Sequence, residues 1–351
     1  MATVSEIEVS ATEAVESGRL PASDQVPNPL VDRRLPSRVV SARVNLRYRL
    51  VELWRCRELM AFLVRKELKV KYKNSVLGFA WSMLNPALVL AVYYVVFTVF
   101  LPSGIPHFAL FLFSGLLGWN LFNNALMGAA GAIVNNAGIV KKVAFPREIL
   151  ALSQVGTACV FFCFQATVLI LFFAGFRYAP DWAMLPLLPF ALVALIAFTS
   201  AFAIFLSAVN VYLRDTQHLI EVVLQAWFWG APIVYGFHEV YQKLSNHRLF
   251  MIPHTHLIWL YLADPLAPVV LTFQRALYGR STWININGKL SPAGAGSCPG
   301  NAHPGCVYVL HAYSTSFYVE ALAVVLVGSI GLFLLAMLLF GRIEGNFAEE
   351  L

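Results

Sequence analysis

Six long apolar segments, separated by short polar stretches, occupy the chain from residue 79 onward. A helix needs about 20 mostly apolar residues to cross the hydrocarbon of a bilayer. Five of the six carry no Lys, Arg, Asp or Glu in their central stretch, and the fifth in order carries Glu221 near its start. The sequence therefore predicts an all-α integral membrane protein with six transmembrane helices. We place them at Phe79–Leu101, Phe108–Val134, Ile149–Phe176, Leu185–Val209, Leu219–Phe237 and Val319–Phe340.

Residues 46–73, just before the first span, have an amphipathic helical pattern. Apolar side chains recur at i, i+3, i+4, i+7 and i+8 from Cys56 to Val64, and charged side chains occupy the opposite arc. A basic helix of this kind lies in the headgroup plane of a membrane. The same pattern fits a helix packed on a soluble domain, but little of the chain remains to form one. We therefore expect an interface helix over 46–73. The polar, acidic residues before it predict a disordered cytoplasmic tail over 1–45.

Two apolar stretches between the fifth and sixth spans are too short to cross a bilayer. They are His256–Ala263 and Leu266–Tyr278, separated by Asp264 and Pro265. Apolar runs of about 10–14 residues beside a membrane indicate re-entrant or interfacial helices, and proline ends a helix. We expect both helices in an external loop over 238–317. The loop also holds Cys298 and Cys306, which are close enough in sequence to form a disulfide on an oxidising face.

Charge sets the orientation. The chain is 13% charged and carries a net charge of +6, whereas about 25% charged residues is usual in soluble domains. Eighteen Lys and Arg residues from position 33 onward fall on one side of six spans, and six fall on the other. Cytoplasmic loops carry the excess of Lys and Arg. We therefore expect a multi-pass protein of the cytoplasmic membrane with both termini cytoplasmic and no nucleic-acid partner. Residues 74–237 are expected to hold spans one to five, and residues 318–351 the sixth span and a short cytoplasmic tail.

Several kinds of chemistry are missing from the sequence. No phosphate-binding loop of the form G-x-x-x-x-G-K-[ST] occurs, so energy for a pump must come from another chain. No His, Cys, Asp and Glu cluster has metal-ligand spacing. Proton-coupled carriers bury ionisable relays in the membrane, and such residues are scarce in these spans. The sequence disfavours a proton-driven antiporter and a membrane-embedded enzyme.

Three amides lie on one face of the second predicted span. Asn120, Asn123 and Asn124 have the spacing i, i+3, i+4, with Trp119 beside them. Amides are costly in lipid unless they are paired or face water. They either join two helices or line a wet passage. We favour the passage, with Trp119 and Trp227 as aromatic surfaces on which sugar rings can stack.

Several stretches together resemble one transporter family. They are Glu67–Lys73, Ser75–Pro86, Lys141–Leu150, Tyr212–Asp215, Gln225–Tyr235, Asp264–Pro268 and Phe273–Gly279. The order of these motifs resembles that in the ABC-2 type polysaccharide and polyol-phosphate export permeases, which include O-antigen and teichoic-acid exporters. The resemblance covers about residues 50 to 340. Asp264 stands where that family commonly has Asn.

The resemblance implies a permease that conducts its substrate and does not alter it. It implies a homodimer bound to two copies of a separate ATPase, which holds ATP and Mg²⁺, with no cofactor in this chain. The implied substrate is an O-antigen-like or galactan-like glycan on a polyprenyl diphosphate.

The resemblance also implies roles for individual residues. The segment 136–148 is the implied coupling helix, with polar handles at Lys141, Lys142, Pro146, Arg147 and Glu148. The short external helices are implied gate helices, with Asp264, Pro265 and Arg275 as gate residues. A diphosphate headgroup requires cations near the cytoplasmic interface. Candidates are Arg65, Lys69, Lys71, Lys73 and Arg214, although Arg214 can equally pair with Asp215.

Rival functions are an ABC-2 exporter of drugs or small lipids, a membrane-embedded glycosyl- or acyltransferase, and an autonomous channel.

Overall fold

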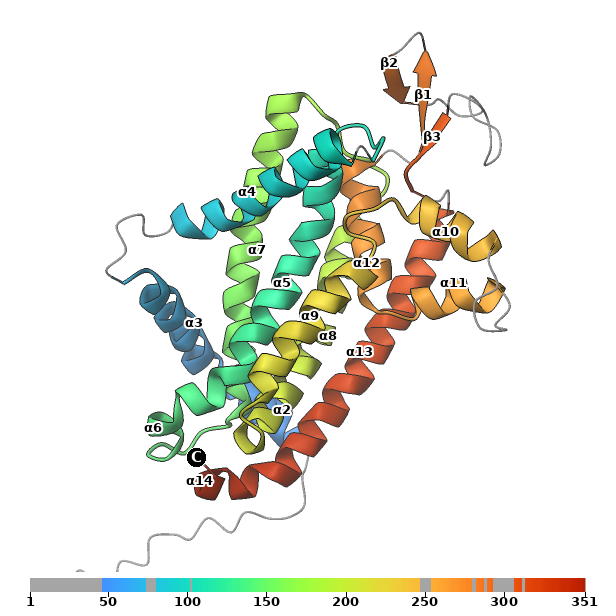
Figure 1. The fold of residues 1–351 in the computed structure, drawn as a ribbon. Coiled ribbons are helices and arrows are strands. Elements are labelled where there is room, and N and C mark those ends of the chain that lie inside the picture. Colours follow the sequence, from blue (N-terminus) through green and yellow to red (C-terminus); the bar gives the residue numbers. More distant parts are fainter. Residues whose placement is uncertain are drawn as a thin grey trace, which may run out of the picture. The chain divides into compact units, whose positions relative to one another are not determined.

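The computed structural model describes most of the chain, and its long elements are helices (Figure 1). The described residues are 46–73, 80–101, 103–246, 254–279, 282–286, 289–292, 306–310 and 313–350. The tail predicted over residues 1–45 lies outside the described residues, and so does Cys298.

Four helices in the described part of the chain are long and apolar enough to cross a membrane. They are α5 (Phe108–Asn135), α7 (Glu148–Phe176), α8 (Leu187–Tyr212) and α13 (Thr315–Ile343). The shortest has 26 residues, which at 1.5 Å per residue gives roughly 39 Å, more than the ~30 Å of bilayer hydrocarbon. These helices coincide with the second, third, fourth and sixth predicted spans.

The first predicted span is helical over almost the predicted residues, but it is not one uniform α-helix. It consists of α4 (Ala80–Val95), which continues into one turn of π-helix, η1 (Val96–Phe100). Its apolar part runs only from Pro86 to Phe100. Pro86 lies inside α4, where it removes one backbone donor from the hydrogen-bond ladder.

The fifth predicted span ends earlier than the sequence indicated. α9 (Thr216–Gly230) has 15 residues, whereas the prediction extended to residue 237. Ala231 follows it with an extended backbone, φ −81° and ψ 147°, because the ring of Pro232 disfavours the helical region for the residue before it. Hydrophobicity does not reveal this break, since the residues after it are also apolar.

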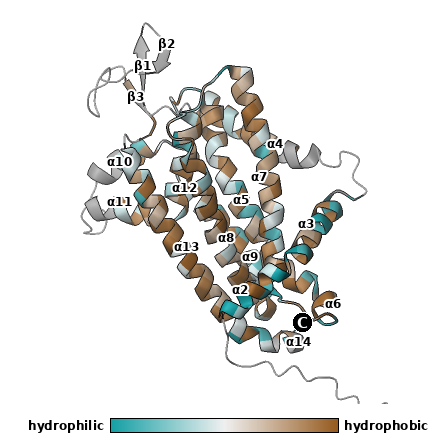
Figure 2. Cartoon of the chain, turned by 180° about the vertical axis from the view of Figure 1, so that it is seen from behind, coloured by the Kyte–Doolittle hydropathy of each residue, from teal (hydrophilic) through white to brown (hydrophobic). Residues whose placement is uncertain are grey.

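α5 is the central helix of the bundle and packs against α4, α7, α8 and α9. Within its most apolar 18-residue stretch 78% of the residues are buried inside the protein, compared with 17% for α7 and 28% for α13. α7 and α13 are apolar along most of their length (Figure 2), and most residues of these apolar stretches are not buried inside the protein. Outward-facing apolar surface of this extent is typical of helices in contact with lipid, which is as apolar as the side chains.

Several buried hydroxyl side chains in these helices bond within their own helix. The hydroxyls of Ser114, Thr157 and Thr199 donate to backbone carbonyls three or four residues earlier, at 2.6, 2.8 and 2.7 Å. A hydroxyl left unpaired in an apolar interior is costly, and this back-bonding removes the cost without a partner from another helix.

Residues 46–73 form two helices, where the sequence predicted one. α2 (Leu46–Arg55) and α3 (Arg57–Tyr72) meet at Cys56. The predicted apolar face lies against the core: Leu63 is buried, and its neighbours on that face are partly buried beside it. α3 lies so close to α7 that a Cβ added to Gly156 would meet the Val64 side chain at 2.9 Å.

Short elements fill the segment between α9 and α13. They are α10 (Phe237–Asn246), α11 (His254–Leu262), α12 (Leu266–Phe273) and one π-helical turn, η2 (Gln274–Tyr278). α11, and α12 with η2, correspond to the two short helices that the sequence predicted. α10 was not predicted.

A small sheet is the departure from the all-α prediction among the described residues. β1 (Thr282–Ile286) pairs antiparallel with β2 (Lys289–Pro292) and β3 (Cys306–Tyr308), in the order β2-β1-β3. β1 is rich in β-branched and aromatic residues, which favour strands. Cys306 is disulfide-bonded, and its pairing with Cys298 stays a prediction.

Candidate functional site

A polar cavity of about 370 Å³ lies between α4, α5 and α9. Four of the five residues that the sequence predicted as channel lining border it: Trp119, Asn120, Asn123 and Asn124. They share one face of α5 because residues three and four apart are neighbours on a helix. α9 contributes Glu221 and Gln225 from the opposite wall.

Asn120 both joins two helices and borders the cavity, the two roles that the sequence left open. Its side-chain Nδ2 donates a hydrogen bond of 3.0 Å to Oε1 of Gln165 on α7, so it joins two helices. It also borders the cavity together with Asn123, which is half-buried, and Asn124, which is exposed. Because Gln165 is itself buried, the pair satisfies two amides in an apolar interior.

Trp227, the fifth predicted lining residue, is not part of the cavity wall. Its ring packs against Phe122, Phe198 and Phe202, with centroid distances of 5.3, 6.3 and 6.1 Å. The next two residues, Phe228 and Trp229, line the cavity instead. One residue along a helix turns the side chain by roughly 100°, and the sequence alone did not fix which aromatic faced inward.

Trp227 holds the turn between α11 and α12. Its indole Nε1 donates a hydrogen bond of 3.0 Å to Oδ2 of Asp264, whose Oδ1 accepts the backbone N–H of Leu266 at 3.1 Å. Burial raises the pKa of Asp264, and the two hydrogen bonds oppose that rise. Pro265 lies between these partners, immediately before α12. The predicted gate turn is therefore attached to α9 by one side-chain bond.

Replacing Trp227 with phenylalanine is expected to loosen this turn. The variant keeps an aromatic ring, although a smaller one, and removes the N–H that Oδ2 of the half-buried Asp264 accepts, which costs about 1–3 kcal/mol of unfolding free energy. Thermal unfolding of the purified protein in detergent measures the loss. Trp229→Phe is the matched control because that ring is 50% exposed. An equal loss in both variants would contradict the role given to the hydrogen bond.

Arg275, the third predicted gate residue, fastens the end of η2. It donates to the carbonyl of Gly279 at 2.5 Å and lies 3.4 Å from a carboxylate oxygen of Asp181, in the segment between α7 and α8. Gly279 has φ +70°, and a Cβ there would meet the Asp181 backbone nitrogen at 3.0 Å. Only glycine tolerates both the positive φ and the close approach.

Of the cations predicted to bind a diphosphate, Lys71 has the most specific surroundings. Its ammonium lies 4.3 Å from the centre of the Phe161 ring, and burial lowers the pKa of Lys71. Lys71 borders a second cavity of about 320 Å³ between α3, α5 and α7. Asn124 and Met127 line both cavities, so the two adjoin.

All five predicted cations, Lys71 included, are exposed. Arg65, Lys69 and Lys73 extend from the outer face of α3, and Arg214 lies in the turn between α8 and α9. Among the described residues no ion pair joins Arg214 to Asp215, so the pairing considered from the sequence is not formed.

The predicted coupling segment divides into two parts. The short helix α6 (Ala137–Val140) ends at Lys141 and Lys142, whose side chains are exposed together with that of Val143. Pro146, Arg147 and Glu148 turn back into the protein and are half-buried or buried.

Arg147 and Glu148 belong to a charge cluster that joins three distant parts of the chain. Glu148 is paired with Arg49 of α2, and Arg49 is also paired with Glu344 in η3 (Glu344–Asn346). Arg147 donates to the backbone carbonyl of Glu344 at 2.7 Å and lies over the ring of Phe347. Phe347 begins the last helix, α14 (Phe347–Glu350). The cluster fixes the coupling segment to α2 and to the end of α13.

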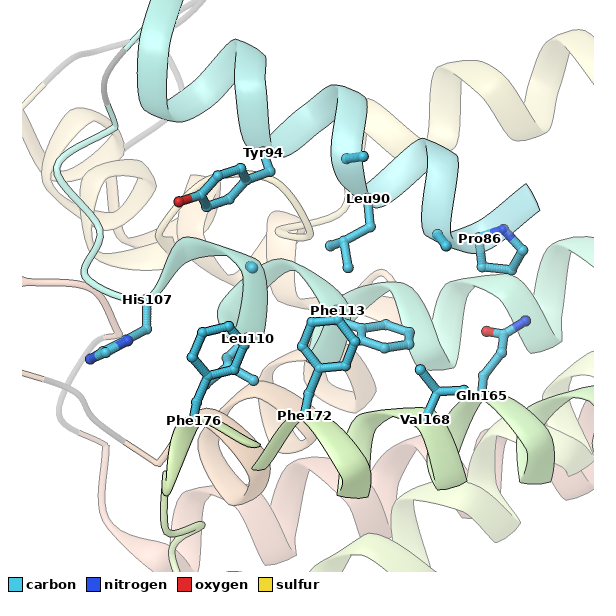
Figure 3. A pocket seen from close by; sticks show the side chains of 13 residues that line it. Pro86, Leu90, Tyr94, His107, Leu110, Phe113, Gln165, Val168, Phe172 and Phe176 are labelled. Atoms are coloured by element: carbon cyan, nitrogen blue, oxygen red, sulfur yellow. The ribbon is translucent and has the colours of Figure 1, made fainter. Parts of the chain in front are cut away.

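An apolar groove of about 430 Å³ lies on the other side of α4, against α5 and α7 (Figure 3). The rings of Phe113, Phe172 and Phe176 line it, with Gln165 toward one end and His107 toward the other. α4 therefore separates a polar cavity from an apolar groove.

The described part of the chain contains no group of three or more His, Cys, Asp or Glu side chains placed to hold a metal ion.

Comparisons with known proteins cover the elements that build these cavities. Residues 58–270, from α3 to α12, match the model of the ABC-2 type transporter family. An O-antigen export system permease protein RfbA of Myxococcus xanthus is 37% identical over 227 residues, which are 65% of this chain and 83% of that protein. Two proteins of the same name from Klebsiella pneumoniae are 29% and 27% identical over 217 and 231 residues, covering 79% and 83% of their lengths and 62% and 66% of this chain.

The family model spans more than half of the chain, and the long apolar helices agree with it. The chain therefore belongs to the ABC-2 type transporter family, as a multi-pass membrane subunit of a transporter.

Proposed function

We propose that this chain is the permease subunit of an ATP-driven exporter that moves a lipid-linked polysaccharide across the cytoplasmic membrane. The substrate class is an O-antigen-like or galactan-like glycan on a polyprenyl diphosphate. The observation that carries the proposal is the amide-lined cavity beside α5, in a family whose relatives above are named for O-antigen export.

The chemistry of the cavity suits a sugar chain. Asn and Gln amides both donate and accept hydrogen bonds, as sugar hydroxyls require, and aromatic rings such as Trp119 and Phe228 offer flat apolar faces. Its walls carry one carboxylate, Glu221, and no Lys or Arg. A polymer can slide along such a surface without a strong ionic contact. A drug or small lipid would be expected to favour a less polar wall.

A second copy of the chain completes the passage in this proposal. A cavity of about 370 Å³ is the size of a site for one small molecule, so a polymer needs a longer conduit. Large apolar side chains flank the cavity and are exposed on α4 and α9, among them Val92 at 61% and Val222 at 69%. Two copies that face each other across these helices bury this surface and join their cavities.

The proposed topology has six crossings with both termini in the cytoplasm. α4 with η1, and α9 with the residues after it, supply the two crossings beyond the four long helices. The excess of Lys and Arg on the α3 and α6 side of the bundle supports this orientation. α10, α11, α12 and the sheet then face outside, with α11 and α12 as the gate.

Energy comes from a separate ATPase in two copies, which binds ATP and Mg²⁺, and this chain holds no cofactor. We place the ATPase contact on α6, Lys141, Lys142 and Val143, because these are the exposed part of the coupling segment. Arg147 and Glu148 transmit movement, since their partners lie on α2 and η3. Pro146 fixes the bend between the two parts.

The lipid diphosphate is taken up beside α3. Lys71 borders a cavity that adjoins the amide-lined one, which supports a path from a cationic rim into the passage. Charge-assisted bonds from Lys or Arg are the strong contacts to phosphate. Arg65, Lys69, Lys73 and Arg214 form the exposed outer rim of this site.

Replacing Asn123 with phenylalanine tests the passage. The larger ring fills part of the cavity and removes an amide from a half-buried position, so folding is retained and export falls. We expect a fall on the order of tenfold, equivalent to about 1.4 kcal/mol in the transport step. The measurement is the amount of glycan on the cell surface and of lipid-linked glycan left in the membrane.

The matched control is Val193→Phe, the same new side chain at a residue of α8 that is 54% exposed. Export is expected to stay normal in that variant. If Asn123→Phe exported normally while it was expressed at the same level, the cavity would not be the route.

A further inference from the structure

A further cavity, of about 750 Å³, lies between α7 and α8, apart from the proposed passage. Its walls are almost entirely apolar and include Phe173, Leu188 and Leu192. Trp182, 72% exposed, and Arg177 border it where α7 ends. Arg177 is its only charged lining residue.

Arg177 occupies an unusual backbone position. It ends α7 in the left-handed conformation, φ 50° and ψ 37°. The backbone N–H of Arg177 donates to the carbonyl of Ala174 at 3.3 Å, and that of Tyr178 donates to Phe173 at 3.0 Å. This is the Schellman pattern, in which the left-handed residue is usually glycine, because any Cβ is strained there. An arginine thus occupies a position whose backbone conformation favours glycine.

The side chain of Arg177 is exposed beside the cavity and is not engaged by another described side chain. Among the described residues, Arg177 makes no side-chain hydrogen bond or ion pair. The nearby carboxylate of Asp181 is engaged by Arg275, at 3.4 Å, and by the backbone N–H of Ala183. Attraction to the negative end of the helix accounts for a cation here, but not for the apolar cavity beside it.

We propose that the cavity between α7 and α8 binds an anionic phospholipid of the surrounding bilayer, with its phosphate on Arg177 and an acyl chain in the cavity. The guanidinium presents forked donors that match phosphate oxygens. The apolar walls accept hydrocarbon, and an exposed Trp close to the end of a membrane-spanning helix is typical of the headgroup level. In the orientation proposed above the lipid belongs to the outer leaflet. The binding site itself rests on the cavity and on Arg177, and it goes beyond the export function.

Photocrosslinking tests the site in the full-length protein. The protein is reconstituted in nanodiscs that contain a trace of phosphatidylglycerol or of phosphatidylcholine, each with a diazirine on one acyl chain. Mass spectrometry then locates labelled peptides. We expect the phosphatidylglycerol probe to label peptides of α7 and α8 around the cavity on the order of tenfold more than the phosphatidylcholine probe, as one charge-assisted contact provides.

Two variants separate charge from fold. Arg177→Gly relieves the left-handed residue, so the protein should be at least as stable as the wild type, yet the preference for phosphatidylglycerol should disappear. Arg177→Lys should keep much of it. Arg342→Gly, which removes an exposed cation from the last turn of α13, should leave the labelling of α7 and α8 unchanged.

The outcomes are decisive either way. Equal labelling by the two probes in the wild type, or an unchanged preference in Arg177→Gly, would overturn the proposal and leave only ordinary boundary lipid. Export is not a readout of the lipid site: normal export in Arg177→Gly would leave the lipid-site proposal standing, and loss of export in Asn123→Phe would not support it. The lipid site and the export passage can therefore be disproved independently.

Discussion

Replacing Arg49 with methionine is expected to lower the free energy of unfolding by about 3–5 kcal/mol, the usual cost of removing one partner of a buried ion pair. The side chain of Glu148 is 2% exposed, and Arg49 is its cationic partner. Without Arg49, the buried carboxyl of Glu148 has no countercharge, so it either stays charged at a cost or must take up a proton. Thermal unfolding in detergent and the yield of monodisperse protein measure the effect.

Two further variants identify the cause. Arg47→Met removes an exposed cation two residues away and should change stability by less than about 0.5 kcal/mol. The double variant Arg49→Met with Glu148→Gln removes both charges and should recover part of the loss. If Arg49→Met were as stable as Arg47→Met, the charge cluster would not hold the coupling segment in place.

Reversing Lys141 and Lys142 to glutamate is expected to weaken binding of the partner ATPase on the order of 100-fold. Two interfacial charge contacts of about 1.4 kcal/mol each give that factor. Both side chains are exposed beside α6, so the protein should still fold and insert. Co-purification of the ATPase with tagged permease, from membranes that contain both, measures the effect.

The control is Arg55→Glu with Arg57→Glu, which changes the net charge equally at two exposed positions where α2 meets α3. That protein should retain the ATPase. Normal retention by the Lys141 and Lys142 variant would remove α6 as the docking element.

The sequence predicted features that depend on local periodicity. Asn120, Asn123 and Asn124 share a face because helical spacing requires it, and they border one cavity. The apolar face from Cys56 to Val64 lies against the core for the same reason. The long helices follow from hydrophobic length alone.

The sequence did not predict which side of a helix faces which neighbour, or which residues far apart in the chain form pairs. Trp227 and Trp229 are two residues apart and face different neighbours, and composition treats them alike. Arg147 and Glu148 looked like exposed handles because their partners, Arg49 and Glu344, lie about 100 and 200 positions away. No local pattern records such pairs.

The hydrophobic pattern also did not reveal where a helix ends within an apolar segment. The end of α9 before Pro232 interrupts an apolar run without changing its character. A proline signal was present, and the rule that residues before proline leave the helix would have shortened the fifth span.

The central claim is that this polypeptide forms the passage and a separate subunit supplies the energy. The direct measurement uses proteoliposomes loaded with a lipid-linked glycan, in which a glycosidase reports how much glycan has crossed the bilayer. We predict crossing only when the permease, the ATPase, ATP and Mg²⁺ are all present, and none with the permease alone. Nucleotide hydrolysis by the isolated chain, or crossing without the ATPase, would contradict the account.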